Sequence, residues 1–216
     1  ASAATSMIFN GRLIAFHPRR TGPTDPPPPR SRTGRSGSTA RRRRRSPPAL
    51  PPPPGLRGRD RSEVVIATKV SLYSKRPGLR PENIITACNE SLERLGTDYI
   101  DIYYSHKDDN EVPIAETLGA YAQLIKAGKV RYIAASQHTG ARLQEALDIS
   151  AQENLPSYIG LQNRYNLMDR EPFESEQEEV VIGNHLSLMP FYSLARGFLT
   201  GKYRNGVAVE SVRAGA

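Results

Sequence analysis

Short apolar runs alternate with segments of helical periodicity along the chain after Glu63. The runs cover residues 64–70, 99–105, 131–136, 158–162 and 186–192, and their first residues are 35, 32, 27 and 28 positions apart. One strand–helix–strand crossover occupies roughly 30 residues. The pattern therefore predicts about five βα units with parallel strands.

The segments between the runs carry the start and stop signals of helices. Pro81 stands at a first-turn position, apolar residues recur on one helical face after it, and Gly96 is suited to end the helix. Pro113 and Thr139 mark the starts of two further helices. A weaker, acidic pattern predicts a fourth helix at residues 174–184.

The predicted strands are apolar almost throughout, as Val64, Val65, Ile66 and Ala67 show. Such runs are typical of a sheet that is covered on both faces, which indicates parallel strands with helices around them. The sequence therefore predicts an α/β fold. Periodicity alone leaves open whether the strands form an open sheet or part of a closed (β/α) barrel.

The first 62 residues differ from the rest in composition. They hold 14 arginines, no lysine, 12 of the 18 prolines and only two acids, Asp25 and Asp60, which gives a charge of +12. The other 154 residues hold 16 basic and 20 acidic side chains, a charge of −4, and the two parts sum to the net +8. Such a tail cannot bury enough apolar surface to offset the entropy of ordering. We predict a disordered segment at 1–62 and a folded domain at 63–216.

Arginine, proline, glycine, serine and alanine, which have GC-rich codons, dominate residues 18–62. Our hypothesis is that this stretch is an out-of-frame translation of a GC-rich gene, joined to the true frame near residues 59–63. Two other interpretations stay open: an organelle transit segment, or a tail whose arginines 41–45 bind phosphates. The tail lacks the interleaved aromatics of a base-stacking surface, which argues against specific nucleic-acid binding.

Cysteine usage and hydropathy indicate the cellular compartment of the protein. Cys88 is the single cysteine, so no internal disulfide forms, and its place on an apolar helix face predicts a buried thiol. No apolar run reaches 18 residues, and the apolar stretch 7–16 is broken by polar residues in its middle. We therefore predict no membrane span, no signal peptide and a cytoplasmic protein.

The active site of a parallel α/β protein lies at the C-terminal ends of its strands, in open sheets and barrels alike. The polar or aromatic residues at these ends are Lys69, His106, Ser136, Gln137, Gln162, Asn163 and residues 191–197. Each also has an ordinary structural explanation: Lys69 as a solvated surface lysine, His106 as a hydrogen-bonded loop histidine, and Phe191 as a core aromatic. His138 and His185 are expected to face solvent.

Two kinds of site are not indicated by the sequence. The His, Cys, Asp and Glu residues show no metal-ligand spacing, so we expect no metal site. No GxGxxG motif follows a strand, so the dinucleotide fingerprint of an open sheet is missing.

Taken together, the strand-end positions resemble the aldo-keto reductases in order and spacing over residues 60–204. The matching segments are 66–69 (Ile-Ala-Thr-Lys), 95–101 (Leu-Gly-Thr-Asp-Tyr-Ile-Asp), 106 (His), 128–133 (Gly-Lys-Val-Arg-Tyr-Ile), 161–162 (Leu-Gln), 165–167 (Tyr-Asn-Leu) and 192–204 (Tyr-Ser-Leu-Ala-Arg-Gly-Phe-Leu-Thr-Gly-Lys-Tyr-Arg). No single motif is decisive, but their common order is a strong signal.

The resemblance implies an NADPH-dependent reductase of aldehydes or ketones on a parallel (β/α) barrel of TIM type, without metal or flavin. In this family a tyrosine donates the proton to the carbonyl, a lysine lowers the pKa of the tyrosine, an aspartate pairs with the lysine, and a histidine orients the carbonyl. Lys69 matches the lysine and His106 the histidine. A phenol with a pKa near 10 needs such a cation to exchange protons near neutrality.

The resemblance also implies a set of cofactor-binding residues. Ser136 and Gln162 match the residues that hold the nicotinamide carboxamide, and Gln137 replaces the asparagine that is more usual beside them. Phe191 matches the aromatic that stacks on the nicotinamide ring. The residues that match the loop passing the pyrophosphate are Leu194, Arg196 and Gly197.

Part of the family pattern has no counterpart. The family's aspartate and tyrosine precede the lysine strand, but residues 1–62 contain no tyrosine, and the segments match only strands three to seven of the eight in a barrel. We expect an incomplete barrel and negligible turnover by this chain, because a proton donor is missing. The alternatives are a non-catalytic module that binds nucleotide or a protein partner, and a basic tail that binds nucleic acid.

Overall fold

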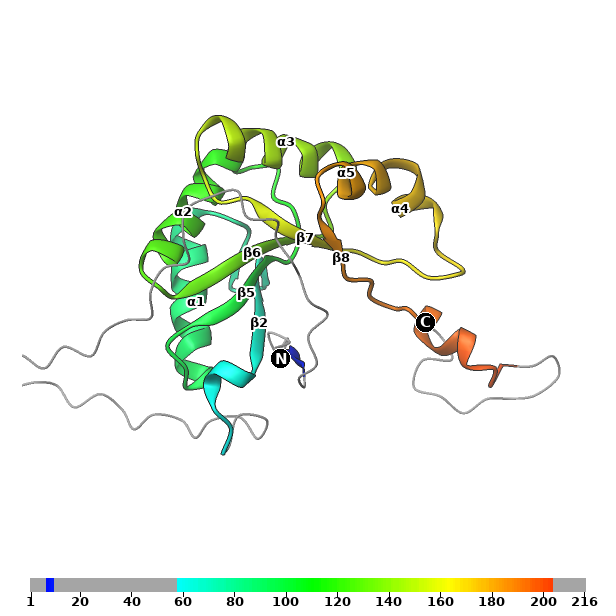
Figure 1. The fold of residues 1–216 in the computed structure, drawn as a ribbon, viewed down its shortest axis with the longest axis horizontal. Helices are drawn as coiled ribbons and strands as arrows, with labels where there is room; N and C mark the ends of the chain where they lie inside the picture. Colours follow the sequence, from blue (N-terminus) through cyan, green and yellow to red (C-terminus); the bar gives the residue numbers. More distant parts are fainter. Residues whose placement is uncertain (1–6, 10–57, 204–216) are drawn as a thin grey trace, which may run out of the picture.

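The computed structural model describes residues 7–9 and 58–203 of the chain (Figure 1). The strands are β1 (Met7–Phe9), β2 (Val65–Val70), β3 (Leu72–Tyr73), β4 (Arg76–Pro77), β5 (Ile100–Ser105), β6 (Val130–Ser136), β7 (Tyr158–Gln162) and β8 (Ser187–Leu188). The α-helices are α1 (Pro81–Leu95), α2 (Ile114–Lys126), α3 (Gly140–Gln152), α4 (Glu171–Glu176) and α5 (Glu178–Gly183), and the 3-10 helices are η2 (Arg61–Glu63) and η3 (Ala195–Thr200).

The five predicted parallel strands form one sheet. Its order is β1-β2-β5-β6-β7-β8, in which each pair from β2 to β8 is parallel and β1 is antiparallel to β2. The prediction of five parallel strands is confirmed, although β8 has two residues where the pattern predicted seven. Among the described residues β1 and β8 lie at opposite edges, so these strands make an open sheet.

A helical layer covers one face of this sheet. Helices α1, α2 and α3 lie side by side along it, α3 also contacts α5, and the crossover helices between consecutive parallel strands fall on the same side (Figure 1). The main core fills the space between the layer and the sheet, and it includes Ile84, Cys88, Tyr121, Ile133 and Leu143. The predicted burial of Cys88 is confirmed.

The opposite face of the sheet carries a smaller apolar cluster, made of Ala67, Tyr104 and Ala134. Side chains alternate along a strand, so Val65 and Tyr132 point to the same side, where they are 40% and 46% exposed. In the part of the chain that the structure describes, the helical layer covers one face of the sheet, and the other face is partly exposed. Apolar strand residues on this face pack against one another rather than against a second helical layer.

The predicted helix ends agree with the structure. Pro81 opens α1, and Gly96 ends it with a left-handed φ of 60°, which only glycine adopts at little cost. Thr139 caps α3 by accepting a hydrogen bond from the Arg142 backbone N–H at 3.2 Å. Pro113 stands directly before α2, as predicted.

The helix predicted at 174–184 is instead two short helices that meet at Gln177. Gln177 is buried, and its Nε2 donates to the His138 carbonyl oxygen at 3.2 Å. Gly140 packs so closely on this junction that a Cβ there would lie 2.0 Å from the Glu176 carbonyl oxygen. A tertiary contact with the start of α3 therefore interrupts the helix, which a local pattern does not reveal.

Two parts of the predicted low-complexity tail lie in the described residues. Met7–Phe9 forms β1, which the sequence pattern did not predict. Arg61 donates hydrogen bonds to the Thr97 hydroxyl and the Tyr99 carbonyl oxygen, both at 2.8 Å, and pairs with Asp101 at 2.7 Å. Its guanidinium also lies 3.8 Å from the centre of the Tyr99 ring. The predictions for residues 10–57, arginines 41–45 included, fall outside the described residues.

Candidate active site

The C-terminal ends of β2, β5, β6 and β7 bring five of the predicted site residues together: Lys69, His106, Ser136, Gln137 and Gln162. The parallel register sets Lys69 opposite Tyr104 and Ser136 opposite Gln162. Hydrogen bonds then join the strand ends across the sheet. The strand-end rule and the resemblance therefore identified residues that are neighbours in space.

Lys69 on β2 is hydrogen-bonded to Gln162 on β7, at the other side of this group. It is partly buried on β2, its Nζ donates a hydrogen bond to Gln162 Oε1, and the same nitrogen lies 5.1 Å from the centre of the Tyr104 ring. Burial lowers the pKa of Lys69 below its usual value, because desolvation disfavours the charged amine. Lys69 is therefore a fixed, partly desolvated group and not a freely solvated surface lysine.

His106 follows β5 and is held by its backbone. Its N–H donates to the Val70 carbonyl oxygen at 2.9 Å, and its own carbonyl oxygen accepts from Gln137 Nε2 at 2.9 Å. Burial, and secondarily the charge of Lys69, lower the pKa of His106 to about 4. The imidazole is thus neutral at pH 7 and has one N–H available to donate to an uncharged oxygen.

The ends of β6 and β7 form a cradle of amide and hydroxyl groups. Ser136 is 1% exposed, and its hydroxyl has no hydrogen-bond partner among the residues that the structure describes. Gln137 has a left-handed φ of 52°, and its backbone N–H donates to the Gln162 carbonyl oxygen at 3.2 Å and to Asn163 Oδ1. A buried hydroxyl without a partner is energetically costly, so Ser136 suits a ligand that supplies the missing hydrogen bond.

Phe191 lies at the edge of this cradle. Its backbone N–H donates to the Asn163 carbonyl oxygen at 3.0 Å, and its ring packs edge-on against Tyr192 with the centroids 5.2 Å apart. The half-buried ring is therefore tied through its backbone to the strand end that carries Gln162.

The three predicted pyrophosphate residues lie apart from the others. Leu194, Arg196 and Gly197 belong to η3 or precede it, and in Figure 1 this helix lies well away from the end of β2. Leu194 is 58% exposed, and the Arg196 guanidinium lies 5.0 Å from the centre of the Tyr192 ring. The structure does not bring these three residues to Lys69 and His106.

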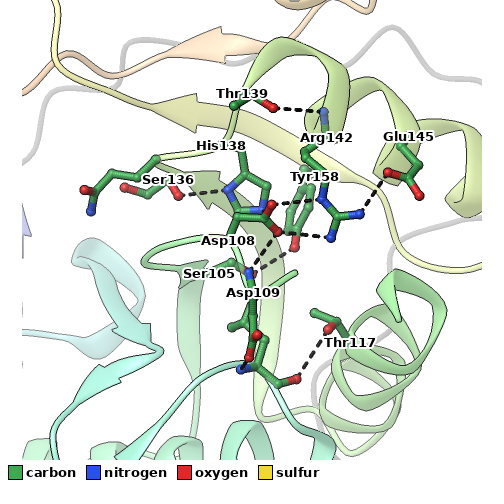
Figure 2. Close-up of polar contacts among 12 residues, drawn as sticks. Ser105, Asp108, Asp109, Thr117, Ser136, His138, Thr139, Arg142, Glu145 and Tyr158 are labelled. Atoms are coloured by element: carbon green, nitrogen blue, oxygen red, sulfur yellow. Dashed lines mark hydrogen bonds and ion pairs between the residues drawn. The ribbon is translucent and has the colours of Figure 1, made fainter. Parts of the chain in front are cut away.

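His138 corrects a prediction, because it does not face solvent. It is 4% exposed, its Nδ1 lies 2.8 Å from the Ser136 carbonyl oxygen, and its Nε2 lies 3.7 Å from Asp108 Oδ1 (Figure 2). Arg142 pairs with the same carboxylate at 2.9 Å. Sequence reasoning missed this group, although its members follow the predicted residues closely: His138 comes two residues after Ser136, and Asp108 two after His106. His185 is exposed, as predicted.

Metal-ligand clusters and membrane-spanning helices are both absent from the residues that the structure describes. Residues 7–9 and 58–203 contain no group of three or more His, Cys, Asp and Glu side chains placed to hold a metal ion. Their helices also include none that combines the length and apolar character needed to cross a membrane.

A family model and individual relatives of known sequence point to the same protein family. The model of the aldo/keto reductase family matches residues 55–214. L-glyceraldehyde 3-phosphate reductase of Escherichia coli K12 is 33% identical over 156 residues, and the protein Tas of the same organism is 34% identical over 178 residues. A putative voltage-gated potassium channel subunit beta of Schizosaccharomyces pombe is 36% identical over 155 residues.

These matches cover much of the chain and less of the relatives. They include 70%, 71% and 69% of this chain, but only 44%, 51% and 45% of the reductase, Tas and the channel subunit, respectively. The chain thus spans about half the length of the curated relatives that it matches. Since the family model matches well over half of its residues, the chain belongs to the aldo/keto reductase family of oxidoreductases.

Proposed function

We propose that the strand ends of β2, β5, β6 and β7 bind the nicotinamide end of NADPH and a small-molecule carbonyl, and that they serve the reduction of aldehydes or ketones to alcohols. The observation that carries the proposal is the convergence of Lys69, His106 and Gln162 at one end of the sheet. We also propose that the protein is located in the cytoplasm and that the reaction uses no metal ion.

The cradle at β6 and β7 suits a carboxamide, which has both a hydrogen-bond donor and an acceptor. The Ser136 hydroxyl is buried without a partner among the described residues, and Gln162 as a whole residue is 6% exposed. A hydroxyl can donate or accept, and the Gln162 amide nitrogen remains able to donate. NADPH, when bound, supplies the hydride. The residues of the chain fix the position of its amide.

Lys69 and His106 would act on the carbonyl side. His106, with a pKa of about 4, is neutral at pH 7 and donates an N–H to the carbonyl oxygen, which orients the substrate. The ammonium of Lys69 would lower the pKa of a neighbouring phenol by favouring its anion. Both roles are electrostatic and need no change in the fold.

We propose further that this chain binds NADPH but has negligible turnover, because it lacks a suitable phenol. Residues 1–62 contain no tyrosine. Tyr104 lies beside Lys69, but its hydroxyl donates to Met189 Sδ at 3.0 Å and burial raises its pKa to about 12. A phenol with that pKa and that partner is a poor proton donor near neutrality.

A fluorescence titration of the 216-residue chain with NADPH tests the binding site. We expect Gln162→Met to raise the Kd about tenfold, since it removes hydrogen bonds worth roughly 1.4 kcal/mol while keeping a similar volume. Gln152→Met, at the exposed end of α3, is the matched control and should leave the Kd unchanged. Equal affinities of the wild type and Gln162→Met would contradict the proposed site.

Turnover is measured separately, by NADPH oxidation with an aromatic aldehyde. We expect no rate above the background for the wild-type chain together with saturable NADPH binding. A measurable rate that disappears in Lys69→Ala or His106→Ala would show that the chain is an active reductase and that the proposed loss of proton donation is wrong.

A further inference from the structure

His138 lies at the centre of a buried polar network behind the candidate cofactor cradle (Figure 2). We propose that His138 is a positioning residue, which fixes the turn at Ser136 and Gln137 in the conformation that receives the nicotinamide carboxamide. The inference deepens the proposed function and rests on it. His138 itself touches neither the cofactor nor the substrate in this assignment.

The hydrogen bond to Ser136 defines the tautomer of His138. Nδ1 lies 2.8 Å from the Ser136 carbonyl oxygen, and a carbonyl oxygen only accepts, so Nδ1 carries the proton. Burial lowers the pKa of His138, while the bond to Ser136 and the charge of Asp108 oppose that effect and Arg142 adds to it. At neutral pH the ring is therefore an uncharged donor that ties residue 138 back to residue 136.

The turn that this bond closes is strained. Gln137 adopts a φ of 52°, which costs a residue other than glycine on the order of 1 kcal/mol. On one side the turn is held by the Gln137 N–H, which donates to Asn163 Oδ1 and to the Gln162 carbonyl oxygen. The His138–Ser136 hydrogen bond holds the turn on the other side, so hydrogen bonds stabilise the strained conformation at both ends.

His138 also connects to Asn163 through its backbone. Its carbonyl oxygen accepts from Asn163 Nδ2 at 3.1 Å and from Gln177 Nε2 at 3.2 Å. The same Asn163 side chain accepts the Gln137 N–H. A shift of His138 therefore disturbs both its hydrogen bond to the Ser136 carbonyl oxygen and the Asn163 side chain that accepts the Gln137 N–H.

Asp108 and Arg142 lie on the other side of the imidazole, where the unprotonated Nε2 has no proton to donate to the carboxylate. Arg142 donates to both carboxylate oxygens of Asp108, at 2.9 and 3.3 Å, and one of these oxygens lies 3.7 Å from His138 Nε2. The Tyr158 ring packs edge-on against the imidazole at 5.7 Å. Asp108 follows His106 by two residues, so the loop that carries His106 lies against the His138 ring.

Two substitutions in the 216-residue chain separate positioning from packing. Asparagine places an amide N–H near the position of Nδ1, so His138→Asn keeps the donor, whereas His138→Phe keeps a planar ring and removes it. We measure the exchange rate of the Gln137 backbone amide without ligand, the NADPH Kd by fluorescence, and the melting temperature. His185→Phe, at an exposed histidine, is the control.

We expect His138→Phe to raise the Gln137 exchange rate and the NADPH Kd about fivefold to tenfold each, and His138→Asn to stay within about threefold of the wild type. Unchanged Gln137 exchange in His138→Phe, or equal losses in both variants, would overturn the assignment. If the wild type does not bind NADPH, the proposed function fails. The Gln137 exchange rates would still show whether His138 stabilises the turn.

A measurement on the unmodified chain keeps the inference testable if His138→Phe does not fold. The ¹⁵N chemical shifts of a histidine ring distinguish its two neutral tautomers. At neutral pH we expect the His138 ring to be protonated at Nδ1 alone. Protonation at Nε2 alone would break the bond to the Ser136 carbonyl oxygen and would overturn the assignment.

Discussion

His106 keeps its imidazole uncharged down to about pH 4, because burial and the nearby Lys69 both disfavour a second proton. In the unfolded chain the same group titrates near its ordinary pKa of 6.5. Between these two pH values the unfolded state binds more protons than the folded state. The contribution of His106 to stability is therefore fully present above pH 6.5 and is lost as the pH falls towards 4.

Urea unfolding of the wild type and His106→Gln at pH 7.0, 5.5 and 4.5 tests this dependence. The variant should lose less unfolding free energy than the wild type over that range, because glutamine does not titrate. His138, whose pKa is also lowered, remains in both proteins and cancels in the comparison. Parallel losses in the two proteins would contradict the shifted pKa.

The sequence predicted that Lys69, His106, Ser136, Gln137 and Gln162 lie at one end of the sheet, because each stands at or directly beside the end of a parallel strand. It did not distinguish His138 from His185, since both stand near helix ends and burial depends on distant residues. For His138 these are Asp108 and Arg142, which reach it from another loop and from α3. The sequence next to position 138 does not show that Asp108 and Arg142 lie beside it.

At the scale of elements, the first residue of α3 determines how α4 and α5 meet. Gly140 has no φ that requires glycine, but an added Cβ would lie 2.0 Å from the Glu176 carbonyl oxygen and 2.8 Å from its carbon. Both contacts are with backbone, which a side-chain rotation does not relieve. Gly140 is therefore needed for close approach rather than for conformational freedom.

Gly140→Ala should lower the unfolding free energy by about 2 kcal/mol, because overpacking moves α3 away from the Gln177 junction. Urea denaturation measures the change. Gly119, inside α2, meets nothing within 4 Å of an added Cβ, so Gly119→Ala should instead stabilise the chain by about 0.5–1 kcal/mol. Equal effects of the two substitutions would show that helix propensity, and not the contact, decides the outcome at position 140.

Elements with a strong local signal were predicted well. The starts of α1, α2 and α3 follow from Pro81, Pro113 and Thr139, the end of α1 follows from Gly96, and the parallel strands follow from their apolar runs. The predictions that failed are those in which tertiary contacts outweigh the local pattern, as at Gln177 and in the short β8.

At the scale of the whole molecule, Arg61 joins the start of the described globular part to the sheet. Asp101 on β5 accepts from Arg61 at 2.7 Å, from Arg131 at 2.9 Å and from the Ile66 backbone N–H at 2.8 Å. The Tyr99 ring lies 3.8 Å and 4.1 Å from the two guanidinium carbons. Arg61, which precedes β2, is therefore part of the folded unit.

Arg61→Met should cost about 2–3 kcal/mol of unfolding free energy, because it leaves several buried or half-buried acceptors without their donor. Thermal and urea unfolding measure this change, with Arg80→Met at an exposed position as the control. A loss below 0.5 kcal/mol would mean that the Arg61 contacts add little to the fold.

The structural role of Arg61 is not evident from the local sequence. Arg61 lies in a stretch whose composition indicates disorder, and its partners 36 to 40 positions away tie it to the sheet. Similarly, a strand pattern shows that both faces of a sheet are apolar but does not show what covers each face. Such long-range partners have no signature in a short window of sequence.

The bond between Lys69 and Gln162 has a consequence for the entropy of ligand binding. A free glutamine side chain samples many rotamers, and fixing it costs about 1.5–2 kcal/mol. Because Lys69 already holds Oε1 of Gln162, that cost falls on the folding of the chain. A ligand that binds Gln162 therefore meets an ordered partner, and less of its interaction free energy is spent on immobilising the protein.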